Sequence, residues 1–337
     1  MQKKIPAKRR PERLVVTLLS LLFLSTAVFA TVKYVFRAPE LDTDKPVVTP
    51  DGTASADVDR TDTDEPDAPG RTRRKYCYNI LVSGLDDDNG GSDTNILVRF
   101  DVPNKRIDLV SLPRDTLLHN EYRNNKLNFA YAKGGTELLM EQIENLLGVP
   151  VDFYVTVNLK GFIALVDQID GVDFDIPINM DYDDPYQDLH IHFTKGPRHL
   201  NGQEAMEVVR FRHNNDGTGY GTEDIGRIGT QQAFLKAVAK QLLQIGNVKN
   251  IPALVDIFCT YVKTDLTTGN LVWLGNEALN IGTENIHFAT LPGDGSGYYN
   301  KQSVYVLDAQ ATCDLVNEAL NPYNEALTLE DMDILVP

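Results

Sequence analysis

The sequence predicts a mixed α+β fold in which a central mixed β-sheet is flanked by helices. Apolar runs of strand length interleave with segments whose apolar residues recur at helical spacing. The links between the expected strands include a short hairpin and longer helical crossovers, which require both antiparallel and parallel neighbours in one sheet. The 337 residues, 42% of them hydrophobic, are enough for one large core or two modest ones.

The N-terminal segment is expected to hold the protein at a membrane. Residues 1–13 are rich in Lys and Arg, and the uncharged run that follows, residues 14–32, has about 19 residues, enough to span a bilayer. Because basic flanks stay in the cytoplasm, we expect a cytoplasmic tail at 1–13 and an uncleaved transmembrane signal-anchor at 14–36, with the remainder outside. A signal-peptidase site at 27–30 is the alternative.

A linker is expected between this anchor and the folded region. Residues 37–75 are rich in Asp, Thr and Pro and nearly lack large apolar clusters, so we expect a disordered, acidic, extracellular spacer. The basic cluster at 71–75, which closes the linker, is expected to be a solvated face. The main folded domain is then predicted at 76–246. A C-terminal extension, 247–337, packs on this domain or follows it.

The first folded elements are expected to be strands. Residues 78–83 form a buried-strand run that ends at Gly84. Residues 95–101 and 106–111 flank a short polar turn at 103–105, which predicts a β-hairpin. Alternating residues at 172–176 predict a half-exposed strand.

Helices are expected where apolar residues recur every three or four positions. One spans 136–147 and stops at Gly148. A second follows a strand at 151–157, begins after the N-cap residue Asn158 and ends before Gly171. A third runs over 225–243 with a single apolar stripe. Beyond Gly246 we expect, in chain order, a helix, a strand at 286–291, a loop at 292–297 and a final helix.

Two arginines one residue apart, Arg210 and Arg212, are the strongest candidates for anion binding. Residues 207–213 are expected to form a short β-rich run, which would place both guanidinium groups on one face. Arg227 and Gln231 are four residues apart and would share a helix face. In a chain with a net charge of −16, clustered arginines are typical of a phosphate or diphosphate site.

Further charged residues upstream fit the same site. Arg114 follows a proline at the end of an expected strand, and Asp86 and Asp93 carry carboxylates suited to a hard metal ion. Local alternatives stay open: a solvated acidic turn around Asp86, an Asx turn at Asp93 and a salt bridge between Arg114 and Asp115. The strong acidity of the chain argues against nucleic acid, because its binders need a basic footprint.

Taken together in their order and spacing, these motifs resemble the LytR-CpsA-Psr family of extracytoplasmic bacterial wall transferases. The resemblance covers roughly residues 78–243. The motifs that carry it are Gly84-Leu-Asp86, Ser92-Asp93-Thr94, Leu112-Pro-Arg114-Asp115, Lys126-Leu-Asn128-Phe-Ala-Tyr131 with Gly134-Gly135, Phe162 through Val172, Leu200-Asn-Gly-Gln-Glu-Ala205, Arg210-Phe-Arg212 and Asp224-Ile-Gly-Arg227 through Gln231.

The resemblance implies a membrane-anchored phosphotransferase with 76–246 as its catalytic domain. It would move a glycopolymer (teichoic acid, capsule or another wall polysaccharide) from a polyprenyl-diphosphate carrier to a peptidoglycan sugar hydroxyl. An apolar groove between helices and sheet would take the prenyl chain. The implied diphosphate-binding residues are Arg114, Lys126, Arg210, Arg212, Arg227 and Gln231. The implied catalytic residues are Asp93, Arg114, Arg210 and Arg212.

The resemblance also implies a metal ion. Asp86 and Asp93 would hold Mg²⁺, with Mn²⁺ as an alternative, and Asp93 is the candidate to accept the proton of the acceptor hydroxyl. Two other functions remain open. One is a hydrolase of lipid-linked diphosphates, and the other is a non-catalytic binder of lipid-linked precursors.

Two positions depart from the family pattern. Family members commonly carry an arginine two residues before the motif aspartate, where this chain has Gly91, and another where it has Thr230. Charge-assisted hydrogen bonds contribute roughly 1.5–3 kcal/mol each, so their loss is consistent with slower transfer, another donor or carrier binding alone. Arg99 and Arg123 are candidates to compensate.

The remaining candidates are two histidines and three cysteines. His190 and His192 alternate as metal ligands do on a strand, but no third ligand is evident nearby, so a solvent-facing strand is expected. An outward domain permits disulfides, and Cys259 with Cys313 is the expected pair, which leaves Cys77 free. Three small buried apolar side chains are the alternative.

Overall fold

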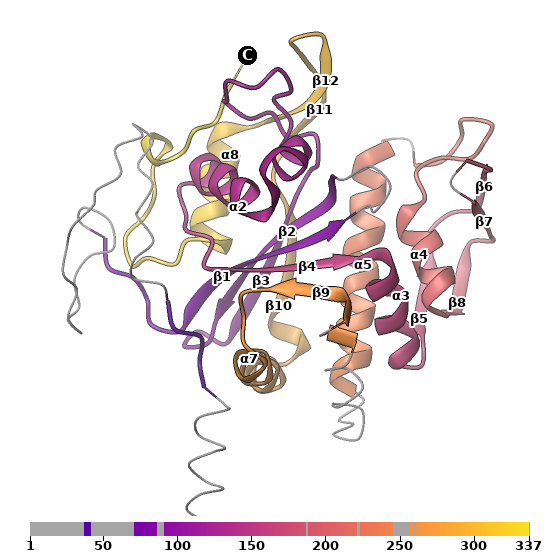
Figure 1. The fold of residues 1–337 in the computed structure, drawn as a ribbon, viewed down its shortest axis with the longest axis horizontal. Coiled ribbons are helices and arrows are strands. Elements are labelled where there is room, and N and C mark those ends of the chain that lie inside the picture. The colour runs from indigo at the N-terminus through magenta and orange to yellow at the C-terminus, as the bar shows by residue number, and fades with distance from the viewer. Residues whose placement is uncertain are drawn as a thin grey trace, which may run out of the picture.

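A six-stranded mixed β-sheet forms the centre of the molecule (Figure 1). The computed structural model describes residues 37–41, 71–85, 91–186, 188–220, 223–244, 257–258 and 260–336. The strands, in the order in which they lie across the sheet, are β10 (Ile286–Thr290), β3 (Arg106–Leu112), β2 (Ser92–Asp101), β1 (Cys77–Leu85), β4 (Phe153–Asn158) and β9 (Val262–Thr264).

The strand directions confirm the predicted mixed sheet. β2 pairs antiparallel with both β1 and β3, as the predicted hairpin requires. β4 is parallel to β1, and the crossover between them contains α2 (Leu127–Leu147). β10 is parallel to β3 and β9 is antiparallel to β4. The segment after residue 246 therefore supplies both outer strands of the sheet.

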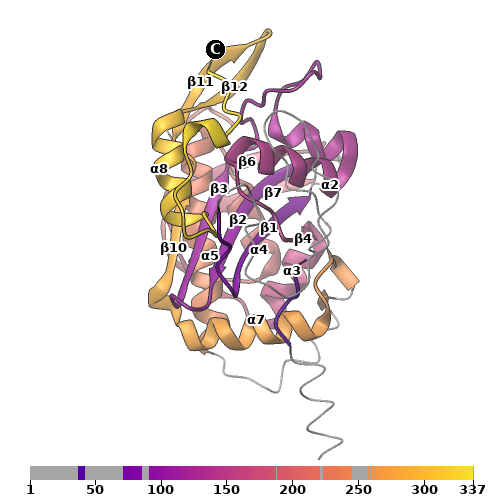
Figure 2. The ribbon, with the colours of Figure 1, turned by 90° about the vertical axis from the view of Figure 1, so that its left-hand side faces the viewer.

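Helices cover both faces of this sheet (Figures 1 and 2). On one face, α2 and α8 (Ala309–Ala319) bury apolar side chains against Leu81 and Leu97 of the central strands. On the other face, α7 (Thr268–Ile281) packs against the cluster that contains Tyr78 and Phe100. Both clusters combine side chains from three or more separate segments, so the hydrophobic effect holds these segments against the sheet.

A second unit lies beside the sheet, with α5 (Glu223–Gln244) between the two in Figure 1. It has its own core, in which Phe211 and Phe234 are fully buried. The side-chain amide of Gln232 donates to Ser111 Oγ, Ala289 O and Thr290 Oγ1 at 2.7–3.0 Å, which ties α5 to the sheet. The other elements of this unit are α3 (Leu159–Gln168), α4 (Gly202–Arg210), the pair β5 (Val172–Ile176) with β8 (Gly196–Leu200), and the pair β6 (Met180–Asp184) with β7 (Leu189–Phe193).

Several local predictions are confirmed. Gly148 ends α2 in the left-handed conformation, and the side chain of Asn158 accepts a hydrogen bond from Gly161 N to cap α3. β5 alternates between buried and exposed residues. The structure also extends the helix to before residue 136, because α2 begins at Leu127 and kinks at Gly134 and Gly135.

Three local predictions are wrong. Residues 207–213 are not a strand, because α4 extends to Arg210. The helix begins at a capping box, in which Asn201 and Glu204 each accept from the other's backbone N–H. The expected loop at 292–297 is β11 (Gly293–Tyr299), which pairs with β12 (Gln302–Leu307). The short 3₁₀ helices η2 (Thr283–Asn285) and η3 (Leu329–Asp331) complete the described elements.

The third wrong prediction concerns the basic cluster at 71–75, which is not a solvated face. Arg71, Arg73 and Arg74 each form an ion pair with the folded domain, at 2.5–2.6 Å from Asp331, Asp152 and Asp101 respectively. Residues 37–41, from the other end of the expected linker, also contact the domain. Pro39 O accepts a hydrogen bond from the Tyr78 hydroxyl at 3.0 Å. The carboxylates that bind the arginines come from distant segments, so local composition did not reveal them.

The expected membrane anchor lies outside the described residues, as does the tail at 1–13. Among the helices that the structure does describe, none combines the length and apolar character needed to span a bilayer.

The cysteines are buried thiols where they are described. Cys77 and Cys313 are both free, so the expected Cys259–Cys313 disulfide is not formed, and Cys259 itself lies outside the described residues. The sulfur of Cys313 lies 3.7 Å from Leu327 O at the end of the core. The alternative interpretation as small buried side chains therefore holds for these two cysteines.

Cys77 is expected to resist alkylation in the folded protein. Its side chain is fully buried, and burial raises the pKa of its thiol to about 11, so little reactive thiolate forms near neutral pH. Iodoacetamide treatment followed by peptide mass spectrometry should find Cys77 unmodified in the native protein and modified after unfolding in urea. Rapid native labelling of Cys77 would contradict this burial.

Candidate functional site

A cavity of about 580 Å³ lies where the ends of β1 and β2 and the segment after β3 meet α3, α4 and α5. Its wall brings together cations that are far apart in sequence. Arg114 comes from the sheet side, Arg210 and Arg212 from the end of α4, and Arg227 from α5. Four guanidinium groups around one cavity form a strongly positive site in a chain with a net charge of −16.

Arg210 and Arg212 reach the cavity by a different route from the one predicted. Arg210 is the last residue of α4, and the backbone becomes extended at Phe211. The Phe211 ring is 1% exposed and packs edge-on against Tyr220, with ring centroids 5.6 Å apart. Because Phe211 is anchored in the core, the arginines on either side of it are held at the cavity wall. The positive charge of Arg210 is also favourable at the C-terminus of a helix.

Arg227 and Gln231 lie one turn apart on α5, as predicted, and both line the cavity. Arg227 is 5% exposed, so its charge acts in a largely desolvated environment. The side-chain amide of Gln231 donates to Val209 O at 3.0 Å. Gln231 therefore fixes the last turn of α4 against α5 and positions the neighbouring Arg210.

Thr230, one of the two departures from the family pattern, does not line this cavity. Its hydroxyl lies 2.7 Å from the Tyr220 hydroxyl and 3.1 Å from Gly226 O. Tyr220 packs so closely on α5 that a Cβ at Gly226 would lie 2.2 Å from the Cβ of Tyr220. Burial raises the pKa of Tyr220, so its hydroxyl stays protonated. Thr230 thus belongs to a packed helix contact.

A chain of charges lies on the sheet side of the cavity. Arg114 forms an ion pair with Asp93, which lines the cavity from β2. Asp115 is 3.6 Å from Arg114 Nε and 3.3 Å from Lys126 Nζ. Lys126 was predicted as a diphosphate ligand, but it is absent from the cavity wall and contacts Asp115 instead. Lys126 is therefore linked to Arg114 through Asp115 in this structure. Arg114 forms the local salt bridge with Asp115 and also lines the cavity.

The loop that follows β1 holds the other predicted metal ligand. The pairing of β1 with β2 shifts register between Gly84 and Leu85, which line the cavity beside Thr94. Such bulges often redirect a strand next to a functional site. Asp86 comes directly after this bulge but lies outside the described residues. Asp93 is the predicted metal ligand that the structure places on the wall.

Part of the cavity lining is apolar, and its residues were not identified from the sequence. Its aliphatic side chains come from four elements, and Tyr182 of β6 and His213 extend it. The ring of Tyr182 meets that of His213 edge-on at 5.6 Å. Among these lining residues, only His213 could have been suspected from the sequence, because it directly follows Arg212. The aliphatic residues are Leu85, Leu159, Leu189 and Val209.

Gly91, the second departure from the family pattern, lies beside a smaller cavity of about 210 Å³ that Asp93 and Arg114 also line. The candidates proposed to compensate for it do not reach the wall of either cavity. Arg99 is 4% exposed and bound to Asp108 at 2.7 Å within the sheet, and Arg123 is exposed. The expectation that Arg99 replaces a missing cation is therefore wrong, because its guanidinium is committed to Asp108.

Comparison with known proteins places these features in a family. The model of the LytR_cpsA_psr family matches residues 48–321. TagV of Bacillus subtilis (strain 168), named a polyisoprenyl-teichoic acid–peptidoglycan teichoic acid transferase, is 31% identical over 252 residues, which cover 71% of this chain. TagU of Bacillus cereus carries the same functional name and is 32% identical over 244 residues, again 71% of this chain. The match spans 62% of the length of TagV and 76% of that of TagU.

Solved structures agree with this match. The crystal structure of B. subtilis TagV has a TM-score of 0.63 at 27% identity and covers 78% of this chain and 100% of its own. A LytR-Csp2A-Psr enzyme from Actinomyces oris, 20% identical, shares the fold with a TM-score of 0.59 over 73% of this chain and 90% of its own. Since the family model spans most of the chain, this protein belongs to the LytR-CpsA-Psr family.

Proposed function

We propose that the protein transfers a glycopolymer from a polyprenyl-diphosphate carrier to a sugar hydroxyl of peptidoglycan. The observation that carries this proposal is the convergence of four arginines on one cavity that aliphatic side chains also line. A diphosphate attached to a prenyl chain likewise combines an anionic group, which arginines bind, with an apolar chain, which aliphatic side chains contact. Relatives named as teichoic acid transferases acting between a polyisoprenyl-linked donor and peptidoglycan give independent support.

The proposed reaction is a phosphoryl transfer. The acceptor hydroxyl attacks the phosphorus next to the glycopolymer, and the bond from this phosphorus to the bridging oxygen of the diphosphate breaks. Polyprenyl phosphate leaves with that oxygen, and a phosphodiester now joins the glycopolymer to the wall. The hydroxyl proton passes to the carboxylate of Asp93, which lines the cavity. No oxidant or reductant is required.

The arginines supply most of the catalytic effect in this proposal. Negative charge accumulates on the oxygens of the transferred group and on the leaving phosphate. Guanidinium groups fixed at the wall stabilise this charge without having to reorganise, and Arg227 does so from a buried position. Asp93 holds Arg114 on the sheet side, while Gln231 holds the end of α4 and thereby Arg210.

The donor set also fits Mg²⁺, which prefers carboxylate, phosphate and water oxygens. Asp93, with its side chain 37% exposed at the cavity wall, would hold the ion together with Asp86. Bound there, the ion would offset part of the charge of the diphosphate. We further propose that the segment 14–36 anchors the protein in the cytoplasmic membrane, with the folded domain outside. This placement would bring the cavity to the lipid carrier.

Acceptor dependence tests the proposed function. The full-length protein in mild detergent is incubated with lipid-linked diphosphate donor and Mg²⁺, with and without a peptidoglycan oligomer, and polyprenyl phosphate is measured. The proposal predicts release only when the oligomer is present. Equal release without acceptor would identify a hydrolase. Donor binding with no release in either condition would identify a carrier-binding protein, and both outcomes would reject the transferase.

Replacement of Gly91 by arginine is expected to strengthen donor binding about 10-fold, near the lower limit for one charge-assisted hydrogen bond. A Cβ at this position has its nearest neighbour, Asn128 O, at 3.8 Å, and the adjoining cavity of about 210 Å³ can take the side chain. The new cation would lie beside Asp93 and Arg114. Donor Kd, measured by fluorescence titration, checks this.

Gly91→Ala is the control for this substitution. It adds the Cβ without the charge and should bind the donor like the wild type, because the contact with Asn128 O is an ordinary one. If Gly91→Arg binds no more tightly than Gly91→Ala, the small cavity does not communicate with the diphosphate and the prediction is wrong.

A further inference from the structure

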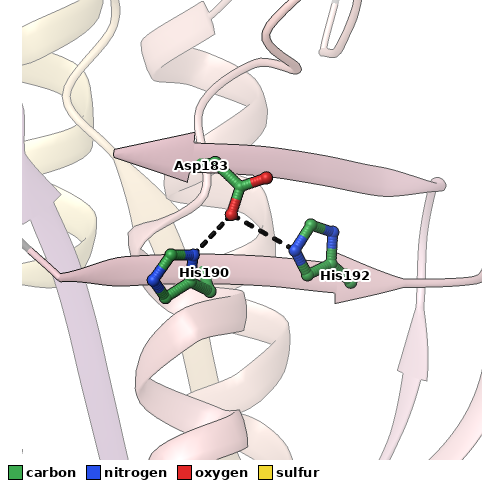
Figure 3. Close-up of side chains that lie close together, drawn as sticks. All are labelled: Asp183, His190 and His192. Carbon is green, nitrogen blue, oxygen red and sulfur yellow. Dashed lines mark hydrogen bonds and ion pairs between the residues drawn. The ribbon is translucent and has the colours of Figure 1, made fainter. Parts of the chain in front are cut away.

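We propose that Asp183, His190 and His192 form a second site, which binds a divalent transition metal and is best matched to Zn²⁺. Figure 3 shows the carboxylate of Asp183 directed at both imidazole rings from the neighbouring strand. The expectation that these histidines have no third ligand nearby is wrong. The site lies outside the arginine-lined cavity, and the proposal does not depend on the transfer reaction.

The register of the β6–β7 hairpin brings the ligands together. Asp183 pairs directly with His190, and Asp181 pairs with His192, with one pair of residues between them in the antiparallel ladder. Side chains of directly paired residues, and of residues two apart on one strand, share one face. All four side chains are therefore on the solvent side of the hairpin, where each is about half exposed or more.

The ligand atoms are already close to a metal-binding arrangement. Asp183 Oδ1 lies 2.5 Å from His190 Nδ1 and 3.3 Å from His192 Nε2. The ligand atoms of all three residues lie within 4.8 Å of one another. Tetrahedral Zn²⁺ with bonds of about 2.0–2.1 Å needs ligand atoms about 3.3 Å apart. Small side-chain rotations therefore suffice to place an ion between them, with water at the fourth position.

Asp181 orients one of these ligands. Its Oδ1 lies 2.8 Å from His192 Nδ1, so a proton on Nδ1 is shared with this carboxylate and the lone pair of Nε2 faces Asp183. A carboxylate behind a histidine ligand is the usual arrangement in protein metal sites, where it fixes the tautomer and strengthens the ligand. Asp181 is thus a positioning residue, which distinguishes this cluster from a chance pair of exposed histidines.

The hairpin that carries the ligands is held firmly in place. Its inner face buries Met180, Ile191 and Phe193 in the second core. Its outer strand is fixed by a neighbouring loop, in which the side chain of Asn214 accepts from Asp181 N at 2.7 Å and that of Asn215 accepts from Asp183 N at 2.6 Å. Ligands on a supported strand keep their geometry better than ligands on a loop.

The ligand set selects the class of metal. Two imidazoles with one carboxylate favour Zn²⁺ and related transition metals over Mg²⁺ and Ca²⁺, which prefer oxygen ligands alone. The same hairpin also forms part of the cavity wall, through Tyr182 and Leu189. Metal bound on the outer face therefore cross-links the two strands whose inner residues line the cavity, and would stiffen this wall.

Calorimetric titration with ZnCl₂ tests the site. Hydrogen bonds with Asp183 and Asp181 raise the pKa of His190 and His192, so protons compete with the metal and the titration is done at about pH 8. The full-length protein in detergent, freed of metal by a chelator, should bind one Zn²⁺ per chain. Asp181→Asn should weaken binding about 10- to 100-fold, the usual effect of losing an orienting carboxylate. His192→Ala and Asp183→Asn should weaken it further.

Two controls make the result specific. His199 is also exposed, on β8, and lies 2.8 Å from Asp173, its partner across the β5–β8 pair, but it has no second histidine. His199→Ala should bind Zn²⁺ like the wild type, and so should Asp93→Asn, which alters the arginine-lined cavity. No saturable binding by the wild type would overturn the proposal. Equal binding by His199→Ala and Asp183→Asn, an isosteric change that preserves the fold, would also overturn it.

Discussion

Arg210→Ala is expected to lower kcat for glycopolymer transfer by about 100- to 1,000-fold, the effect of losing one preorganised group that stabilises transition-state charge. Arg210 ends α4 at the cavity wall, where Gln231 holds the adjacent backbone of Val209. Its charge is therefore fixed before the donor arrives. Initial rates of polyprenyl phosphate release at saturating donor measure this directly.

Arg198→Ala is the matched control for this substitution. Arg198 lies on β8 in the same unit, pairs with Glu204 at 2.7 Å and lies over the ring of Phe193, away from the cavity wall. Its removal takes away the same charge and should leave kcat unchanged. If the two variants lose activity equally, general surface charge rather than the arginine-lined cavity explains the effect.

Phe211→Ala is expected to lower the free energy of unfolding by about 3–5 kcal/mol, the usual cost of removing a fully buried phenylalanine. Phe211 is 1% exposed in the core of the second unit and packs against Tyr220. The same ring anchors the segment between Arg210 and Arg212. Urea unfolding followed by circular dichroism measures the change in stability, and the surviving folded protein should also bind donor less tightly.

Phe211→Leu separates the two effects. Leucine keeps most of the buried volume and should cost less than about 1.5 kcal/mol. It should therefore keep Arg210 and Arg212 at the wall, with donor binding near that of the wild type. A Phe211→Ala variant as stable as Phe211→Leu would contradict the assignment of Phe211 as the core anchor of this segment.

The sheet and most helices could be predicted because their signals are local. The hairpin of β2 and β3 and the caps at Asn158 and Gly148 depend on residues that are neighbours in sequence. The cationic part of the site was also predictable, since the spacing of Arg227 and Gln231 on a helix fixes their common face. Although the strand predicted at 207–213 is wrong, the predicted directions of the side chains there hold, because Phe211 is buried in either case.

The rest depends on contacts between distant segments and on the register of strand pairs. The charge of Arg73 is matched by Asp152, and that of Arg99 by Asp108 from the next strand, and neither pairing is visible in composition. The apolar wall of the cavity is assembled from four elements, none of which differs in sequence from ordinary core. Asp183 becomes the third residue beside His190 and His192 only through the register of one hairpin.

The fate of a phosphorus label tests the central claim most directly. A lipid-linked donor carrying ³²P in the phosphate next to the glycopolymer is incubated with the full-length protein, Mg²⁺ and a peptidoglycan oligomer. The proposed transfer predicts label in the oligomer, in a phosphodiester, and unlabelled polyprenyl phosphate. Label that stays with the lipid, or appears only in free phosphorylated glycopolymer, would contradict transfer by the arginine-lined cavity.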